Sequence, residues 1–214
     1  MIFTTTYLTE KINEYISSLD YNHEPHELYN PIDYVLEVGG KRVRPLLMLM
    51  SYNLFKDDIE SILPQAAAIE MYHNHTLLHD DLMDKADLRR NRPTVHKKWD
   101  ENSAILSGDT MLILAYKYMC ECDNIVLDKV VSLFTNTAIE ICQGQQWDIQ
   151  FEKMDNVTID QYIEMIRLKT AVLLSAALKI GAIKAGATDK DADYLYNFGI
   201  NIGLAFQLQD DYLD

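Results

Sequence analysis

Residues 77–84 have the sequence Leu-Leu-His-Asp-Asp-Leu-Met-Asp, which places three carboxylates at the end of an apolar, helix-periodic segment. On an α-helix, Asp80 and Asp84 are one turn apart on the same face, whereas Asp81 is rotated by about 100°. Like charges at this spacing repel and destabilise the helix, which a bound cation would offset. Mg²⁺ suits all-oxygen sites with few protein ligands, because it takes its other ligands from water and substrate phosphates. The stretch predicts a helix that ends in a magnesium site, with an exposed acidic helix end as the alternative.

The same spacing of aspartates recurs near the end of the chain. Residues 207–214 have the sequence Gln-Leu-Gln-Asp-Asp-Tyr-Leu-Asp and again follow an apolar helical stretch. Two copies on separate helices can face each other across a bundle and hold one diphosphate between them through metal ions. The recurrence therefore favours a metal site over an acidic surface.

Helical periodicity runs through most of the remaining chain. Period-two alternation is never sustained, and the hairpin dipeptides Asn-Gly and Asp-Gly do not occur. Thr158 and Thr188 have the character of helix starts, and Gly186 that of a helix end. We expect an all-α fold, a large antiparallel helical bundle, in a single domain over residues 1–214. The expected helices lie near residues 6–19, 30–38, 43–55, 60–84, 102–121, 125–152, 158–185 and 188–214.

The charge of the chain is distributed unevenly. A net charge of −14 disfavours a nucleic-acid partner, because phosphate neutralisation dominates such binding. Basic residues nevertheless gather in two short clusters, which indicates local anion sites, with solvated surface charge as the alternative for either cluster. The clusters are Lys41, Arg42 and Arg44, and Arg89, Arg90 and Arg92.

The first basic cluster follows two glycines, in residues 39–45, Gly-Gly-Lys-Arg-Val-Arg-Pro, at an expected helix start. Glycine allows the backbone to approach a ligand closely, and a helix N-terminus favours anions. The planar guanidinium of arginine matches phosphate oxygens. The segment predicts a second diphosphate site, one that uses cations instead of metal.

Nothing in the sequence indicates export or membrane insertion. No apolar run approaches the roughly 20 residues of a membrane span, and the N-terminus lacks the features of a signal peptide. Three cysteines, an odd number, make a poor disulfide framework. We expect a cytoplasmic protein.

Taken in order, these motifs resemble those of the trans-type polyprenyl diphosphate synthases, which include farnesyl and geranylgeranyl diphosphate synthases. The resemblance runs from about residue 30 to the last residue. It implies the isoprenoid (terpenoid) synthase bundle around a central cavity, usually assembled as a homodimer. The matching blocks are residues 39–45, Glu70-x-x-His73, residues 79–84, residues 87–94, Lys169-Thr170 and Gln207-x-x-Asp210-Asp211-x-x-Asp214.

The resemblance also implies a role for each matched side chain. Asp80, Asp84 and Asp210 resemble ligands of two or three Mg²⁺ ions, for which Mn²⁺ is a substitute. The supporting carboxylates are Asp81, Asp211 and Asp214. The implied ligands of the allylic diphosphate are Arg89 and Lys169, and those of isopentenyl diphosphate are Lys41, Arg44, His73 and Arg90. Thr170 and Gln207 would turn oxygens toward a carbocation.

The implied reaction joins isopentenyl diphosphate head to tail to an allylic diphosphate (dimethylallyl, geranyl or farnesyl) and releases diphosphate. It proceeds by magnesium-assisted ionisation to an allylic cation. In this family, the residues four and five before the first aspartate limit product length. Here they are Thr76 and His75, neither of them a bulky aromatic. We expect a C15 to C20 product, with Tyr72, one turn further, as the candidate stop.

Three other classes share parts of the pattern. A class I terpene cyclase also has an Asp-rich helix, but usually carries a different second metal motif and needs no isopentenyl site. A ferritin-like bundle would use Glu70-x-x-His73, but the sequence has no second Glu-x-x-His. A non-catalytic subunit of a heteromeric synthase typically lacks aspartates that are all present here. Family members usually continue beyond the second motif, so we expect the domain to be truncated at its C-terminal end.

Overall fold

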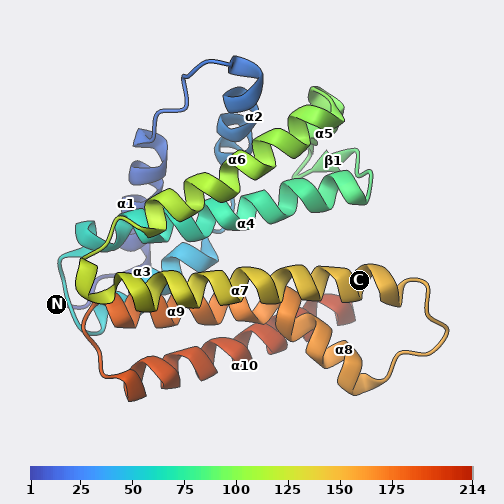
Figure 1. The fold of residues 1–214 in the computed structure, drawn as a ribbon. Helices are drawn as coiled ribbons and strands as arrows, with labels where there is room; N and C mark the ends of the chain where they lie inside the picture. The colour runs from blue at the N-terminus through green and yellow to red at the C-terminus, as the bar shows by residue number, and fades with distance from the viewer. Residues whose placement is uncertain (214) are drawn as a thin grey trace. The chain divides into compact units, whose positions relative to one another are not determined.

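The computed structural model describes residues 1–213, so Asp214 and its predicted supporting role lie outside the described residues. The described chain is almost entirely helical (Figure 1). Its sheet is one short antiparallel pair, β1 (Leu88–Arg89) with β2 (Arg92–Pro93). The all-α prediction is confirmed.

The helices follow one another with short connections, coloured in chain order in Figure 1. In order they are α1 (Thr5–Ser18), α2 (His26–Glu37), α3 (Val43–Asn53), the 3₁₀ turn η1 (Ile59–Ile62), α4 (Leu63–Met83), α5 (Val95–Lys98), α6 (Glu101–Met119), α7 (Asn124–Phe151), α8 (Ile159–Ile166), the π-helical turn η2 (Arg167–Ala171), α9 (Val172–Lys184) and α10 (Asp189–Leu213).

The predicted helix ends have the expected local chemistry. Thr158 caps α8 in a capping box with Gln161, in which each side chain binds the other residue's backbone N–H. The Thr188 hydroxyl accepts a hydrogen bond from the Asp191 backbone at 3.1 Å, at the start of α10. Gly186 follows α9 with φ +79°, the left-handed conformation typical of a helix end.

Two predicted helices differ from the structure. The helix expected over residues 158–185 is interrupted by the π turn η2, which carries Lys169 and Thr170. The helix expected from residue 30 begins earlier, at His26, where Pro25 supplies an extended N-cap and Glu27 lies in the first turn. A carboxylate in the first turn is favourable because it faces the positive end of the helix dipole. Pro31 is then inside α2.

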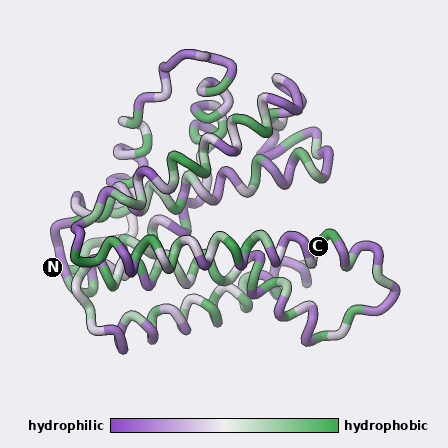
Figure 2. Tube along the Cα trace, viewed as in Figure 1, coloured by the Kyte–Doolittle hydropathy of each residue, from purple (hydrophilic) through white to green (hydrophobic). Residues whose placement is uncertain are grey.

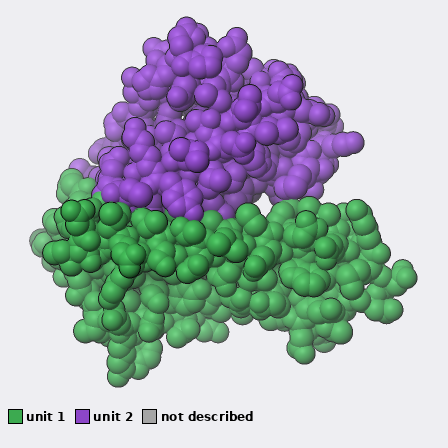
Figure 3. Space-filling view, in the orientation of Figure 1, with its two compact units in different colours: residues 1–3, 47–62, 122–214 green, residues 4–46, 63–121 purple. Residues whose placement is uncertain are grey.

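The chain divides into two compact units that alternate along the sequence (Figure 3). The first unit comprises residues 1–3, 47–62 and 122–214, and the second comprises residues 4–46 and 63–121. We describe each unit by itself. A single domain around a central cavity stays a prediction.

In the second unit, α4 packs along α6, and α1 and α2 pack against this pair. The core of the unit includes Ile12, Ile32, Ile69 and Met71, all at most 1% exposed. Burial of the middle of α4 brings its C-terminal end, with the first aspartate motif, next to the β1–β2 hairpin.

In the first unit, α9 packs against both α7 and α10. Nearly every residue from Val172 to Ile183 is buried, including the polar Ser175. Figure 2 shows hydrophobic residues recurring along the helices of the chain. Among residues 1–213, no helix is both long enough and apolar enough to cross a membrane.

Candidate active site

The first aspartate motif ends α4, as predicted. Asp84 closes the last turn through its backbone N–H, which donates to the Asp80 carbonyl at 2.9 Å. Asp80 is half-buried and Asp84 is exposed, whereas Asp81 is buried on the other side of the helix. The rotation expected between these carboxylates is therefore present. It leaves Asp80 and Asp84 accessible to solvent and Asp81 buried.

The Asp81 carboxylate binds the guanidinium of Arg89. The Arg89 Nε donates to both Asp81 carboxylate oxygens at 2.8 Å. This pair raises the pKa of Arg89, with Asp80 and Asp84 adding smaller contributions. Arg89 is thus anchored by the motif it accompanies, and its remaining guanidinium nitrogens are close to the aspartate end of α4.

The predicted metal ligands fit a magnesium site in part. Asp80 and Asp84 supply oxygens one turn apart at a solvent-accessible helix end, and Mg²⁺ commonly takes one or two carboxylates with substrate phosphates. Asp210 is exposed on α10, in the other unit. No three metal-binding side chains come together within residues 1–213. The three-aspartate set remains a prediction.

Arg44 and His73 form the centre of the predicted isopentenyl site. The Arg44 Nη1 lies 3.1 Å from the His73 Nε2. The Arg44 Nε is buried and has no protein hydrogen-bond partner among residues 1–213. Burial lowers the pKa of Arg44 to about 10, against the opposing effect of Glu70. An orphaned donor on a buried cation is what an anionic ligand would satisfy.

The imidazole of His73 is held neutral. Its burial, followed by the charges of Arg44 and Arg90, lowers its pKa well below the usual range. A neutral imidazole adds no further positive charge to the cluster and accepts a hydrogen bond from Arg44 through the unprotonated ring nitrogen. The predicted residues Arg44, His73 and Arg90 are therefore electrostatically close within one unit.

Arg90 reaches the glycine loop because Gly40 has no side chain. A Cβ at Gly40 would lie 2.7 Å from both terminal nitrogens of the Arg90 guanidinium. Arg90 itself has a left-handed backbone, with φ +51°, in the turn between β1 and β2. Such a conformation costs energy for a non-glycine residue and is concentrated at functional sites. Lys41, next to Gly40, is exposed.

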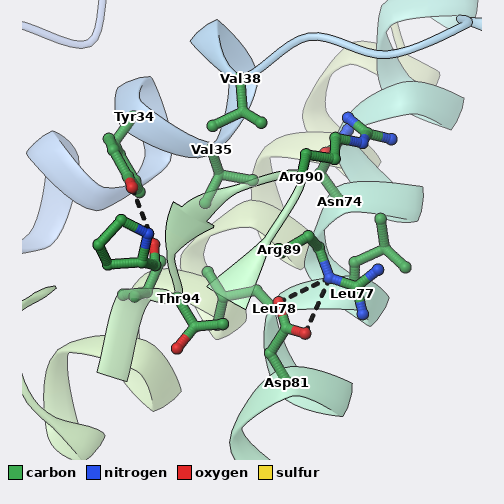
Figure 4. Close-up of a pocket in the computed structure, with 12 residues that line it drawn as sticks. Tyr34, Val35, Val38, Asn74, Leu77, Leu78, Asp81, Arg89, Arg90 and Thr94 are labelled. Carbon is green, nitrogen blue, oxygen red and sulfur yellow. Dashed lines mark hydrogen bonds and ion pairs between the residues drawn. The ribbon is translucent and has the colours of Figure 1, made fainter. Parts of the chain in front are cut away.

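A pocket lies beside this cluster, between α2, α4 and the β1–β2 hairpin (Figure 4). Val35, Val38 and Leu77 give it a largely apolar wall. In Figure 4, Arg89 points to Asp81, whereas Arg90 points away from it. The two adjacent arginines thus lie in different surroundings, Arg89 beside Asp81 and Arg90 beside Gly40. Separate roles were predicted for them.

One functional interaction was missed from the sequence. Arg42, which was grouped with Lys41 and Arg44 in a candidate anion-binding cluster, is 6% exposed, and its Nη1 lies 2.6 Å from a carboxylate oxygen of Glu70. The signal was present in the single carboxylate of the apolar run 66–72, which needs a counter-charge when buried. The pairing also leaves Glu70 unsuited to the di-iron role of a ferritin-like bundle.

The first unit gathers a different set of predicted residues. The Lys169 Nζ lies 2.6 Å from an Asp148 carboxylate oxygen, and both side chains are about one-third exposed. Asp148 lies on α7, near its C-terminal end. Lys169 is on the π turn η2, and π turns are frequent at functional sites.

Thr170 and Gln207, for which the same role was predicted, are hydrogen-bonded to each other. The Thr170 hydroxyl donates to the Gln207 Oε1 at 2.9 Å. Gly203, one turn before Gln207, allows this approach, because a Cβ there would lie 2.6 Å from the Cα of Ala171. The close packing of α10 on η2 therefore sets the Thr170–Gln207 distance.

The chain of hydrogen bonds continues to a residue that the sequence analysis did not identify. The Gln207 Nε2 donates to one Asp211 oxygen at 2.8 Å, and the Tyr162 hydroxyl donates to the other. Burial and then this contact raise the pKa of Tyr162 to about 12. Asp211 is thereby committed to protein groups and fixes which end of the Gln207 amide faces Thr170.

Comparisons with known proteins show the family of this chain. The family model described as "Polyprenyl synthetase" matches residues 25–214. A geranylgeranyl diphosphate synthase of Methanosarcina mazei is 43% identical over 89% of this chain and 59% of its own length. A geranylfarnesyl diphosphate synthase of Natronomonas pharaonis is 39% identical over 96% of this chain and 65% of its own.

A solved structure described as a geranylgeranyl pyrophosphate synthase has the same fold. It is 48% identical, with a TM-score of 0.96, over 99% of this chain and 64% of its own length. The chain thus spans about three-fifths to two-thirds of the length of these relatives. The predicted synthase-type fold is confirmed for the described residues.

Proposed function

Because the chain belongs to the polyprenyl synthetase family, we propose that it condenses isopentenyl diphosphate with an allylic diphosphate. The reaction joins the two head to tail, extends a trans-prenyl chain by five carbons and releases diphosphate. Its allylic partner is dimethylallyl, geranyl or farnesyl diphosphate.

One observation carries the proposal. Helix α4 has carboxylates suited to a metal-bound diphosphate at its C-terminal end, and His73 beside the orphaned Arg44 donor about two turns earlier. Two anion sites of different chemistry on one helix suit a reaction in which one diphosphate leaves and the other is retained. A metal holds and activates the leaving group, whereas cations alone bind the retained one.

The allylic diphosphate belongs at the aspartates. Asp80, Asp84 and Asp210 would hold Mg²⁺ (two or three ions, with Mn²⁺ as a substitute), which supplies Lewis-acid neutralisation of the leaving group when bound. Arg89 and Lys169 would bind its oxygens directly. Fixed cations aimed at the charge that develops on the leaving group stabilise the transition state.

Isopentenyl diphosphate belongs at Lys41, Arg44, His73 and Arg90. Holding it against the allylic carbon lowers the entropic barrier to bond formation, an effect worth on the order of 7–11 kcal/mol in well-oriented systems. Its double bond attacks the allylic cation, and the product cation loses a proton to the released diphosphate. The hydroxyl oxygen of Thr170 and the amide oxygen of Gln207 would face the positive charge.

Product length is proposed to be C15 to C20. Tyr72 is 2% exposed, and its ring lies 5.6 Å from that of His75, which binds the Gly108 carbonyl at 2.9 Å. A large, fixed ring one turn beyond the limiting positions supports a stop for the growing chain. The name of the Natronomonas relative implies a C25 product, so the same framework can also accept a longer chain.

Chromatography of the products of a Tyr72→Ala variant tests this stop. We expect longer prenyl chains, because the substitution opens space along α4. Products of unchanged length would remove Tyr72 from the proposal without affecting the proposed reaction.

The decisive experiment is incorporation of labelled isopentenyl diphosphate into geranyl or farnesyl diphosphate, with Mg²⁺ and with EDTA. The chain is assayed beside a version continued to the length of its relatives. Elongation that stops with EDTA is the expected result. Diphosphate release without elongation would favour the terpene cyclase alternative, and inertness of both proteins would favour a non-catalytic subunit. A homodimer in the cytoplasm stays a prediction.

A further inference from the structure

The segment between α2 and α3 carries three cations that differ in their surroundings. Lys41 is exposed, and Arg44 has an orphaned donor beside His73. Arg42, between them, points into the second unit and is 6% exposed. A cation that serves a ligand must reach it, so Arg42 has another function.

Each nitrogen of the Arg42 guanidinium has a protein hydrogen-bond partner. Its Nη1 donates to Glu70 of α4 at 2.6 Å, and its Nη2 donates to the Leu36 carbonyl at the end of α2 at 2.9 Å. Its Nε reaches the Asn13 side chain of α1 at 3.4 Å. One side chain therefore joins three helices to the loop that carries Lys41.

The backbone at Arg42 also departs from the ordinary. Its φ is +48°, a left-handed conformation that disfavours residues with a Cβ. Such a conformation persists only where the surroundings over-determine it. The three contacts of the buried guanidinium supply that constraint, and they leave Lys41 exposed and Arg44 beside His73.

Glu70 is the other half of the arrangement. It is 2% exposed, and the same carboxylate oxygen that binds Arg42 accepts a bond from the Asn74 amide at 3.2 Å. Its charge raises the pKa of Arg44, in opposition to burial. Glu70 therefore neutralises Arg42 directly and favours the charged form of Arg44. It lies three residues before His73 on α4.

We propose that Arg42 and Glu70 are a buried positioning pair for the cation-only diphosphate site, which set the loop so that Lys41 and Arg44 face the same anion. Neither residue touches the substrate. This inference rests on the proposed function, because it names isopentenyl diphosphate as the anion. It predicts that loss of the pair weakens that site and leaves the metal-dependent site intact.

The test separates positioning from stability. Replacing one member of a buried ion pair strands a charge, whereas replacing both with apolar residues is often neutral for stability. The informative protein is therefore the double variant Arg42→Met with Glu70→Met, made in the full 214-residue chain. Lys129→Met is the control, since it removes the cation of the exposed Lys129–Asp189 pair, which is outside the proposed sites.

Calorimetry then gives the Kd of isopentenyl diphosphate in EDTA and that of geranyl diphosphate with Mg²⁺. For the double variant we expect about a 10- to 100-fold rise in the first Kd, as for reacting groups displaced by about 1 Å. The second Kd should stay at the wild-type value, and the Lys129→Met control should change neither. Arg42→Lys, which keeps the charge but loses the fork, should fall between wild type and the double variant.

A folded double variant with an unchanged isopentenyl Kd would overturn the inference, as would an equal weakening of both Kd values. If the double variant does not fold, the Arg42→Lys comparison decides in the same way. Wild-type protein that binds geranyl diphosphate but never isopentenyl diphosphate would overturn the proposed condensation itself.

Discussion

The two units hold their polar side chains in place through different interactions. In the second unit, Arg42 and Glu70 form an ion pair with both side chains at most 5% exposed. In the first unit, Thr170, Gln207, Asp211 and Tyr162 form a chain of hydrogen bonds that includes the exposed Asp211 carboxylate. One arrangement is a buried charge pair, and the other is a network open to water.

The difference indicates which kind of site needs side chains held in a rigid arrangement. A site that binds an anion with cations alone must keep like charges together, and a buried counter-charge such as Glu70 does so without competing for the ligand. A site that orients an amide and a hydroxyl needs only directional bonds, which remain effective beside solvent. We therefore expect the two regions to respond very differently to the loss of a single group.

The largest effect is expected from Glu70→Gln. This substitution keeps the shape of the side chain but leaves Arg42 without its counter-charge, so the free energy of unfolding should fall by about 3–5 kcal/mol. Urea unfolding followed by circular dichroism measures the change. Asp87→Asn is the control, because the exposed Asp87–Lys97 pair should contribute little. Equal losses in the two variants would abolish the distinction between buried and exposed charges.

The second effect concerns acid. Burial, then the charge of His79, lowers the pKa of His75 to about 4, and burial holds the pKa of His73 well below its usual range. The unfolded chain then binds more protons than the folded chain below pH 6.5, so stability is lost as the pH falls. For His75 alone the loss between pH 7 and pH 5 should be about 2 kcal/mol.

Urea titrations of wild type and His75→Gln at both pH values measure this loss. The variant should lose less stability on acidification, and His73→Gln should show the same trend. His26 is exposed and serves as the control. A wild-type stability that is constant from pH 7 to pH 5 would show that neither imidazole is held neutral.

These contrasts also show how far the sequence alone could lead. The aspartate motifs, Thr158 and Gly186 are local signals, since spacing and capping act within one turn, and they located the ends of their helices. Arg42 could not be separated from Lys41 and Arg44 by composition, because its burial depends on Asn13 and Glu70, which are 29 and 28 residues away. The sequence alone does not show which of several neighbouring cations is buried, because burial depends on how the helices pack.

The π turn was hidden for a related reason. Residues 158–185 have continuous helical periodicity, and no glycine or proline marks the change at η2. The extra residue in the turn is supported by the contact of η2 with α10, which no local pattern reveals. Tyr162 was missed likewise, since its partner Asp211 is 49 residues away.

A smaller effect on stability, with a clear effect on turnover, is expected from Thr170→Val. The substitution keeps the volume but removes the hydroxyl that donates to Gln207, so stability should fall by about 1 kcal/mol. If the hydroxyl oxygen faces the carbocation, kcat for elongation should fall about tenfold or more while the isopentenyl KM is unchanged. Thr170→Ser should restore kcat; a serine variant as slow as the valine variant would indicate packing instead of the hydroxyl.

The smallest change is expected from Tyr162→Phe, at the solvent end of the same network. Its hydroxyl donates to an exposed carboxylate that water can also satisfy, so we expect about 0.5 kcal/mol of stability to be lost. Asp211 then keeps its bond to Gln207, so kcat should change far less than in Thr170→Val. Asp211→Asn, whose side chain can turn its amide nitrogen toward Gln207 Nε2, should slow turnover more than Tyr162→Phe. If Tyr162→Phe were as slow as Thr170→Val, the network would transmit its constraint from the solvent end, and the contrast with the buried Arg42–Glu70 pair would disappear.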